Sequence, residues 1–433
     1  MSFPSPAGHR PKPLKTYERM MGLNSSEGRR NGAVMLYLLL LAAYFMSNFF
    51  RISPAVLLPR LAREMGMTAA VTGFISSLFF YAYGGVQPLC GALNDRYGPM
   101  RTGALGMALC ALGTFMFSFA DSPASLGIAR LLTGLGLGPI FSGVLVHQAH
   151  GFPKERYAAL TGITIAVGNL GAVISVAPLG MSLDKLGRFN TFIILGTISL
   201  AVAAAMWLCR SRDLVVGQSP RGTSMLKGLK DGMALLLKGH RGIKAATLMW
   251  ASTVGLQISL QGLWAVAWFE EAYRCGTGPA RNWATLIGVG MMAGTLLGGR
   301  LASLARGRTW VLASFGGAIA ASWALFLAVM HLKAPLPLAG AAGALIGVTS
   351  GVGVVAANSA INDLVDRDRI GALIGAANMT VFAFVILSQW GSGVLIEAFG
   401  GQSSLGFLKT YGALTTLLTL CMLPILTVKS FRR

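Results

Sequence analysis

The feature of this 433-residue chain that most limits its fold is a series of long apolar runs. Each run has about 20 residues, the length that an α-helix needs to cross a hydrocarbon core of about 30 Å. Strands are needed nowhere, so we expect an all-α membrane protein with twelve transmembrane helices. The expected helices lie near residues 34–59, 70–91, 102–120, 124–147, 157–181, 190–209, 245–269, 283–304, 309–330, 337–361, 371–394 and 404–428.

The charged residues indicate how these helices are oriented. Only 12% of the residues are charged, whereas a soluble domain has about 25%. The net charge of +21 comes from 36 lysines and arginines against 15 acidic residues. With the N-terminus in the cytosol, most of the basic residues fall in cytosolic segments, which is the positive-inside bias. We therefore expect cytosolic termini, and basic charge that serves topology and lipid headgroups of the bilayer rather than nucleic acid.

The chain divides into two halves of six helices each. Residues 1–32 are polar and basic, and we expect a cytosolic tail rather than a cleaved signal peptide. Residues 33–209 and 244–430 form the N-terminal and C-terminal halves. The central loop, 210–243, has apolar residues at helical spacing, which predicts an amphipathic helix on the inner membrane face; a partner-binding helix is the alternative. The five cysteines show no pairing or metal spacing, so we expect neither a disulfide framework nor a metal site.

Two short motifs identify the family that this chain resembles. The loop after the second helix reads GALNDRYGPMR, and the fourth helix contains ARLLTGLGLGP. The residues that match the patterns G-x-x-x-D-R-x-G-x-x-R and R-x-x-x-G are Gly91, Asp95, Arg96, Gly98, Arg101, Arg130 and Gly134. Together with twelve helices and a long central loop, they resemble the major facilitator superfamily of transporters over residues 33–430. The resemblance implies two pseudo-symmetric halves with a substrate site between them.

In that family the loop after helix two acts as a gating latch. The resemblance implies that Asp95 interacts with the N-terminal end of helix eleven and holds the cytosolic side closed, a contact that the helix dipole favours. The glycines permit a tight turn. Arg367 or Arg369, in the facing loop, could also pair with Asp95. The alternative is a solvated charge pair between Asp95 and Arg96.

The first helix contains an arginine, Arg51, in the segment YFMSNFFRISPAVLLP. In helical projection Tyr44, Ser47, Asn48 and Arg51 fall within about a third of the circle. Such a stripe should face the bundle interior, because lipid does not solvate it, and ionisable residues inside a membrane are functional candidates. The alternative is that Arg51 lies near the outer interface and snorkels there.

Arg51, with Pro59 eight residues later, resembles helix one of the organophosphate:phosphate antiporters and of the anion:cation symporters. In both branches an arginine at this point binds the anionic group of the substrate, and its planar fork of donors suits a carboxylate or phosphate. The chain departs from both patterns. Phe50 and Leu137 replace the symporters' proton-coupling acids, and helix seven lacks the antiporters' second arginine. One arginine would poorly compensate a phosphate dianion, so we expect a monoanion, preferably a carboxylate.

Helix seven is the repeat-mate of helix one and supplies further candidates. Its polar and aromatic residues at helical spacing are Trp250, Thr253, Gln257, Gln261, Trp264 and Trp268. We expect Gln257 and Gln261 to hydrogen-bond the substrate, with Tyr44 and Asn48, and Trp264 to cover its apolar body. The alternative is packing between helices. Weaker candidates are Tyr83, Gln87, Asn169, Asn358 and Asn378.

No acidic residue lies in the middle of an expected helix. This absence argues against a cationic substrate and removes the usual proton carrier. His147, in helix four, could relay a proton, and Arg130 could contribute to the anion path; structural roles are the alternatives for both. Coupling to a proton, exchange for a counter-anion and uniport therefore stay open.

The sequence predicts a secondary active transporter of a small organic anion, with Arg51 as the binding charge, in a bacterial inner membrane. The two halves would rock around the site to alternate access. We expect a monomer with no cofactor and no enzymatic activity, because no nucleophile–base pair or metal constellation is visible. The alternatives are a transporter of an amino acid or another neutral or zwitterionic metabolite, and a transporter-like nutrient sensor.

Overall fold

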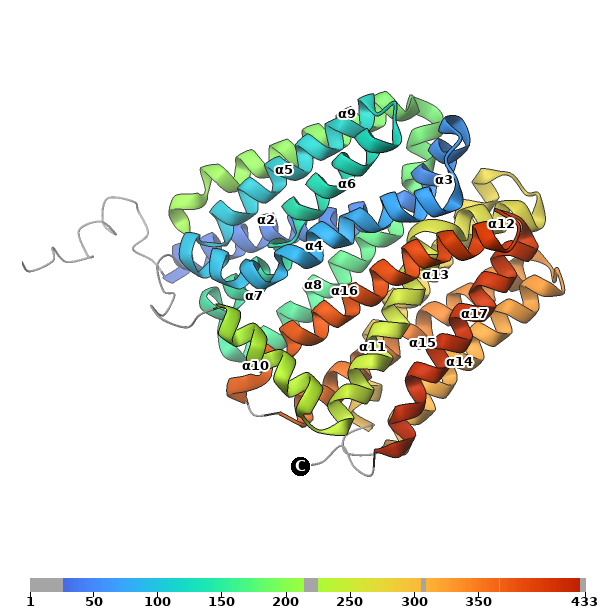
Figure 1. Ribbon diagram of the computed structural model, residues 1–433. Helices are drawn as coiled ribbons and strands as arrows, with labels where there is room; N and C mark the ends of the chain where they lie inside the picture. Colours follow the sequence, from blue (N-terminus) through green and yellow to red (C-terminus); the bar gives the residue numbers. More distant parts are fainter. Residues whose placement is uncertain (1–25, 214–224, 305–308, 366, 429–433) are drawn as a thin grey trace, which may run out of the picture.

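The computed structural model describes residues 26–213, 225–304, 309–365 and 367–428, with all side chains except those of residues 26–30, 154, 158, 225–229, 302–304, 309 and 367–372. Every regular element in these ranges is a helix, and Figure 1 shows the helices as two adjoining bundles. The prediction of an all-α fold is confirmed.

The N-terminal half begins with α2 (Ser26–Ile52), which continues as α3 (Pro54–Met65) after a break at Ser53. Pro54 explains the break, because it has no N–H to donate to the carbonyl of Phe50. Gly187 has a φ of 74°, which favours glycine, and at this point the fifth expected helix gives way to the sixth. The other helices of this half are α4 (Ala69–Tyr97), α5 (Pro99–Phe119), α6 (Pro123–Leu137), α7 (Ile140–Gly151), α8 (Lys154–Ile174) and α9 (Ala177–Leu208).

Two short elements lie between the halves, η1 (Arg210–Arg212) and α10 (Met225–Lys238). Helix α10 packs against α16 and α4, with Leu236 buried. The C-terminal half consists of α11 (Arg241–Ser259), η2 (Leu260–Trp264), α12 (Ala265–Tyr273), α13 (Thr277–Leu304), α14 (Thr309–His331), α15 (Leu336–Asp363), α16 (Arg367–Ala398), α17 (Ser404–Met422) and η3 (Leu423–Thr427).

Eleven helices in the described ranges are long and apolar enough to cross a membrane, whereas the sequence predicts twelve. The difference is the expected helix at 245–269. It is present as α11, η2 and α12, but a π-helical turn interrupts it and glutamine and serine side chains lower its hydropathy. π-Helical turns are rare and occur frequently at functional sites.

The contacts between the two halves include two long helix pairs, α4 with α16 and α8 with α13. Helices α4 and α16 lie side by side in Figure 1, and glycine allows their backbones to touch. A methyl group on Gly73 would lie 2.6 Å from the carbonyl oxygen of Gln389. At the other pair, Asn169 Nδ2 donates to Thr295 Oγ1 at 2.9 Å.

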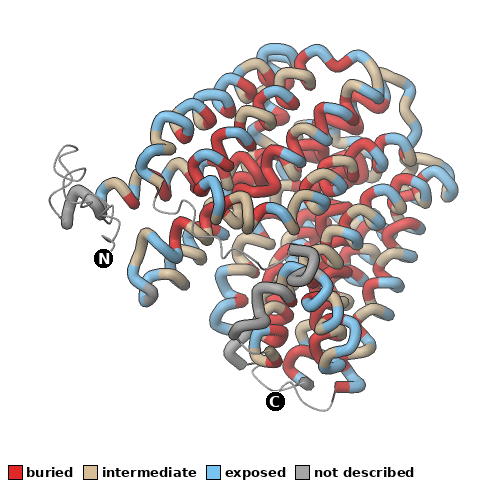
Figure 2. Tube along the Cα trace, turned by 60° about the vertical axis from the view of Figure 1, so that its left-hand side comes forward, coloured by how far each residue is buried: buried red, intermediate tan, exposed pale blue. Residues whose placement is uncertain are grey.

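Figure 2 shows buried residues between the helices and exposed residues around the outside of the bundle. The exposed set includes large apolar side chains such as Leu105 and Phe119, which suits a surface solvated by lipid rather than water. Following the predicted topology, we call the end of the bundle with Gly98 and α10 the inner end, and the opposite end the outer end.

Candidate functional site

Arg130, one of the two arginines predicted inside helices, is held by backbone carbonyls. Its Nη1 donates to the carbonyl of Phe50 at 2.9 Å and its Nη2 to that of Ser76 at 3.1 Å. The Phe50 carbonyl is the one that Pro54 leaves without a helical donor. Arg130 Cζ also lies 4.6 Å from the ring centre of Phe79. These contacts connect α6 to α2 and α4. They are what a structural role for Arg130 predicts, rather than a role in the anion path.

Arg51, the other arginine, is in the last turn of α2, where the helix dipole favours a cation. Its Nε is buried and has no hydrogen-bond partner in the described part of the chain. None of the ion pairs found among the described residues includes it. The span continues through α3 to Met65, about 21 Å further along the helical path. Because α3 carries the exposed charges of Arg60, Arg63 and Glu64, the depth of Arg51 in the membrane stays a prediction.

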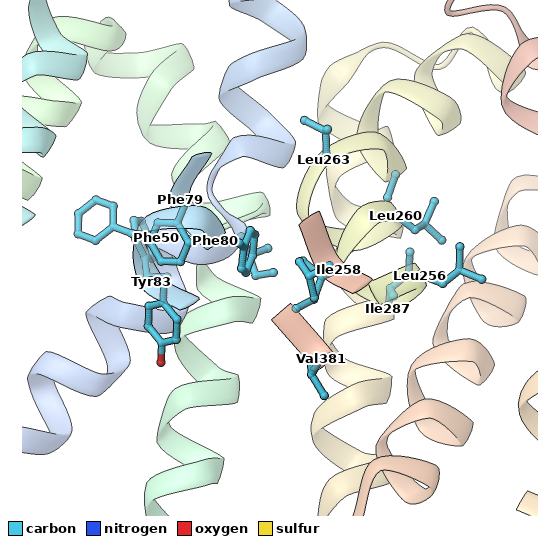
Figure 3. Close-up of a cluster of buried hydrophobic side chains, with 14 of the residues drawn as sticks. Phe50, Phe79, Phe80, Tyr83, Leu256, Ile258, Leu260, Leu263, Ile287 and Val381 are labelled. Atoms are coloured by element: carbon cyan, nitrogen blue, oxygen red, sulfur yellow. The ribbon is translucent and has the colours of Figure 1, made fainter. Parts of the chain in front are cut away.

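Tyr83 links Arg51 to the opposite half. Arg51 Cζ lies 5.0 Å from the centre of the Tyr83 ring, a cation–π distance. The centre of the Tyr83 ring also lies 5.1 Å from that of Phe382 in α16. Figure 3 shows Phe80, close to Tyr83, directed toward Ile258 of the C-terminal half. The site around Arg51 therefore borders the junction between the halves.

Tyr44 and Asn48 lie against α8, within the N-terminal half. The Tyr44 ring stacks on Phe141 with 5.1 Å between ring centres, and Asn48 Nδ2 donates to the Tyr44 carbonyl at 3.1 Å. A methyl group on Gly168 of α8 would overlap both side chains. The structure thus brings Tyr44 and Asn48 together on the helix of Arg51, and their contact with substrate stays a prediction.

Gln257 and Gln261 are at the end of α11 and in the π-helical turn. Gln257 Nε2 donates to Gln261 Oε1 at 3.2 Å, while Gln257 Oε1 is buried with no partner among the described residues. The residue after Arg51 reaches this turn, because Ile52 Cδ1 lies 3.4 Å from the position of a methyl group on Gly262. The structure therefore places the end of α2 against the turn that carries Gln261.

Gln389 of α16 meets the same turn and was not among the predicted site residues. It is fully buried, its Nε2 lies 3.5 Å from the carbonyl oxygen of Ile258, and its Oε1 has no partner in the described ranges. The only sequence signal was an amide in an apolar helix. That signal does not reveal which side of α16 faces the opposite half.

Trp264 and Trp268 have different surroundings from the two glutamines. Trp264 is fully buried and its Nε1 donates to Ser392 Oγ at 2.9 Å, while Trp268 stacks on Tyr411 at 5.2 Å. A π-helical turn takes up one extra residue, so it rotates the residues that follow by about 100° relative to a continuous α-helix. In this conformation Trp264 packs against α16 and α17, and a contact with substrate stays a prediction.

His147 also makes a backbone contact. Its Nε2 lies 2.9 Å from the carbonyl oxygen of Ala33, and the ring is buried beside Phe152. This contact connects α7 to α2, as expected if His147 has a structural role rather than relaying a proton. No group of His, Cys, Asp or Glu side chains in the part of the chain that the structure describes is arranged to hold a metal ion.

The predicted gating loop has the tight turn that its glycines suggested. Gly98 ends α4 and precedes α5 with a φ of 86°, a conformation that favours glycine. Asp95 is partly buried, and Arg96 is exposed. The side chains of Arg367 and Arg369 lie outside the described residues, so the partner of Asp95 stays a prediction.

The comparison with known families agrees with this architecture. The sequence model of the Major Facilitator Superfamily matches residues 40–389. The chain belongs to the major facilitator superfamily. Solved facilitators have the same fold: a bacterial homologue of the human lysosomal transporter Spinster has a TM-score of 0.74 at 13% identity, over 92% of this chain and 97% of that chain. A D-xylose-proton symporter has a TM-score of 0.70 at 13% identity, over 89% and 96%.

Curated relatives of this facilitator are named as transporters of anions. The "Probable sulfoacetate transporter" of Cupriavidus necator is 28% identical, over 36% of this chain and 36% of the relative. The "Probable L-galactonate transporter" of Escherichia coli is 26% identical, over 55% and 52%. The "Hexuronate transporter" of Bacillus subtilis is 28% identical, over 40% and 40%. The chain thus spans about half or less of their lengths. The matched family is one of transporters, and these relatives are named as transporters.

Proposed function

We propose that this facilitator is a secondary active transporter that carries a small organic anion across a bacterial inner membrane, with both termini in the cytosol. The observation that supports this most strongly is Arg51. Its guanidinium is a planar cation, yet none of the ion pairs found among the described residues includes it, and its Nε has no partner there. An anionic substrate would supply both the charge and the acceptors, with bidentate geometry in the case of a carboxylate.

The surroundings of Arg51 suit a monoanion with further polar groups. Tyr83 orients the guanidinium, and the amides of Gln257 and Gln261 offer donors and acceptors from the opposite half. Tyr44 and Asn48 complete the polar side of α2. A site shared by both halves fits alternating access, because substrate contacts then change as the halves rock. Sulfoacetate, L-galactonate and hexuronate, which the names of the relatives contain, each carry an anionic group.

A thermal-shift screen of the purified protein against carboxylates, sulfonates, phosphate esters, amino acids and neutral sugars tests this proposal. A ligand at 100 times its Kd stabilises the native state by about 2.7 kcal/mol. We expect carboxylates or sulfonates to raise the Tm of the wild type. The same compounds should leave Arg51→Gln unshifted, and Arg51→Lys, which keeps the charge but loses the fork, should respond weakly.

Two outcomes would count against the proposal. Equal stabilisation of the wild type and Arg51→Gln by the same anions would remove Arg51 from the binding site. Stabilisation by amino acids but not by simple carboxylates would favour a zwitterionic substrate. Uptake and counterflow assays with the strongest ligands then test whether binding leads to transport, which separates a transporter from a sensor.

A further inference from the structure

An ion pair at the outer end crosses from one half of the transporter to the other. Nη2 of Arg281, in α13 of the C-terminal half, donates to Asp184 Oδ2, in α9 of the N-terminal half. Arg60 Nη1, in α3, lies 3.9 Å from the other carboxylate oxygen of Asp184. The side chain of Arg281 is only 7% exposed, whereas that of Asp184 is 44% exposed.

Arg281 occupies a slot in the surface of the opposite half. Gly180 precedes Asp184 by four residues and therefore lies on the same side of α9. A methyl group on Gly180 would overlap the Arg281 side chain at Cδ, so only glycine leaves room for it. The space beside Arg60, Asp184 and Arg281 is about 40 Å³, which is too small to pass an organic solute.

We propose that Arg281, in its slot between Gly180 and Asp184, is the lock that keeps the outer end of this transporter closed. This inference rests on the alternating-access mechanism proposed above. Opening the outer end separates α13 from α9, so Arg281 must leave its carboxylate. A hydrogen bond between two charged groups is among the stronger ones in a protein, and this bond can form only while α13 and α9 are together, so it favours the outward-closed conformation.

Two other contacts cross the outer end but lie at the surface. Arg63 Nη2 is 3.7 Å from Glu270 Oε2, with side chains 54% and 29% exposed. Glu397 Oε2 accepts from Ala70 N at 3.2 Å, at the exposed start of α4. Both contacts line an open hollow of about 620 Å³. Exposed ion pairs contribute little, so Arg63 is a matched control for Arg281: the same residue type, at the same end, spanning the same two halves.

The experiment measures how often the outer end opens, without any substrate. Ala55 lines the small space next to Arg281, does not line the open hollow, and is buried. A cysteine there, in a background without the five native cysteines, would react with an impermeant maleimide at a rate set by the population of the open state. We expect Arg281→Gln to raise this rate at least about tenfold, because a charge-assisted hydrogen bond of the closed state is lost, and Arg63→Gln to raise it less than about fivefold.

Gly180→Ala is the second test, because it disturbs the slot and changes no charge. It should raise the alkylation rate in the same direction as Arg281→Gln. The proposal is overturned if either Arg281→Gln or Gly180→Ala reacts at the parent rate, or if Arg63→Gln reacts as fast as Arg281→Gln. The alkylation assay contains no ligand, so such a failure would not count against the anion proposal, which the thermal-shift screen tests separately.

Discussion

Arg51 and Arg130 are the same residue type in neighbouring helices, yet their surroundings assign them opposite roles. Arg130 donates through Nη1 and Nη2 to backbone carbonyls of two other helices, and Arg51 has no such contact among the described residues, although Nε of both arginines is buried there without a partner. We therefore expect Arg130→Gln to destabilise the ligand-free protein by about 2 kcal/mol or more, because two charge-assisted hydrogen bonds between helices are lost. Arg51→Gln should leave its Tm unchanged or higher. Equal losses of Tm in a thermal melt without ligand would contradict this assignment.

Asp213, just beyond the last helix of the N-terminal half, gives a pH-dependent prediction. Its Oδ2 accepts a hydrogen bond from Met100 N at 2.9 Å, at the start of α5. Burial raises the pKa of this carboxyl to about 6, against about 3.9 in an unfolded chain. The folded state thus binds the proton more tightly, so the free energy of unfolding falls as the pH rises from about 4 to about 6, and then levels off.

Asp213→Asn should remove this contribution, because the amide does not titrate in this range while its oxygen can still accept from Met100. The wild type should lose Tm between pH 4.5 and pH 6 relative to the variant, and the difference should be constant above pH 7. Thermal melts of both proteins across that range check the prediction. Parallel Tm profiles would show that Asp213 does not titrate near pH 6.

At the scale of helices, the π-helical turn η2 separates two kinds of side chain that a continuous helix would present together. Trp264 hydrogen-bonds to Ser392 and packs beside Phe407, whereas Gln261 faces Gln257. We expect Trp264→Phe to lower the free energy of unfolding by about 1–3 kcal/mol, because Ser392 loses a buried donor, and to change the Kd of an anionic ligand less than about twofold.

Gln261→Ala is the matched comparison for Trp264→Phe. It should weaken the anion by about fivefold or more, which corresponds to the loss of one hydrogen bond of about 1 kcal/mol, and should change the unfolding free energy less than Trp264→Phe does. Both quantities come from the same titrated thermal-shift series. If Trp264→Phe raised the Kd more than Gln261→Ala does, Trp264 would have to be part of the binding site.

At the scale of the whole molecule, the position of the acidic residues bears on coupling. Asp184, Glu270 and Glu397 make contacts at the outer end of the bundle, and Asp213 is beyond the inner end of α9. No acidic residue lies in the middle of a helix expected from the sequence, so the usual proton carrier is missing. We therefore expect exchange: an unlabelled anion on the opposite side should stimulate uptake of a labelled anion in proteoliposomes. Dissipating the proton gradient should change the initial rate less than about twofold. Loss of uptake with the proton gradient would instead point to a protonation site such as His147.

The sequence by itself determined the features that depend on local pattern. Apolar runs of membrane-spanning length specify the all-α fold, because in hydrocarbon a helix satisfies its own backbone groups. The motif around Gly98 predicted a tight turn that the structure contains. The sequence also predicts that Arg51 faces the bundle interior, because the stripe that it shares with Tyr44 and Asn48 is a property of one helix.

Only the tertiary structure decided which distant groups meet. The acceptors of Arg130 belong to α2 and α4, the slot for Arg281 belongs to α9, and Gln389 reaches the π-helical turn from α16. The π-helical turn contains both Gln261 and Trp264, and only the structure shows that Gln261 contacts Gln257 whereas Trp264 contacts Ser392 of α16. A hydrogen bond or a close packing contact depends on atoms from separate segments, and a periodic pattern within one segment contains no information on the neighbour that supplies them.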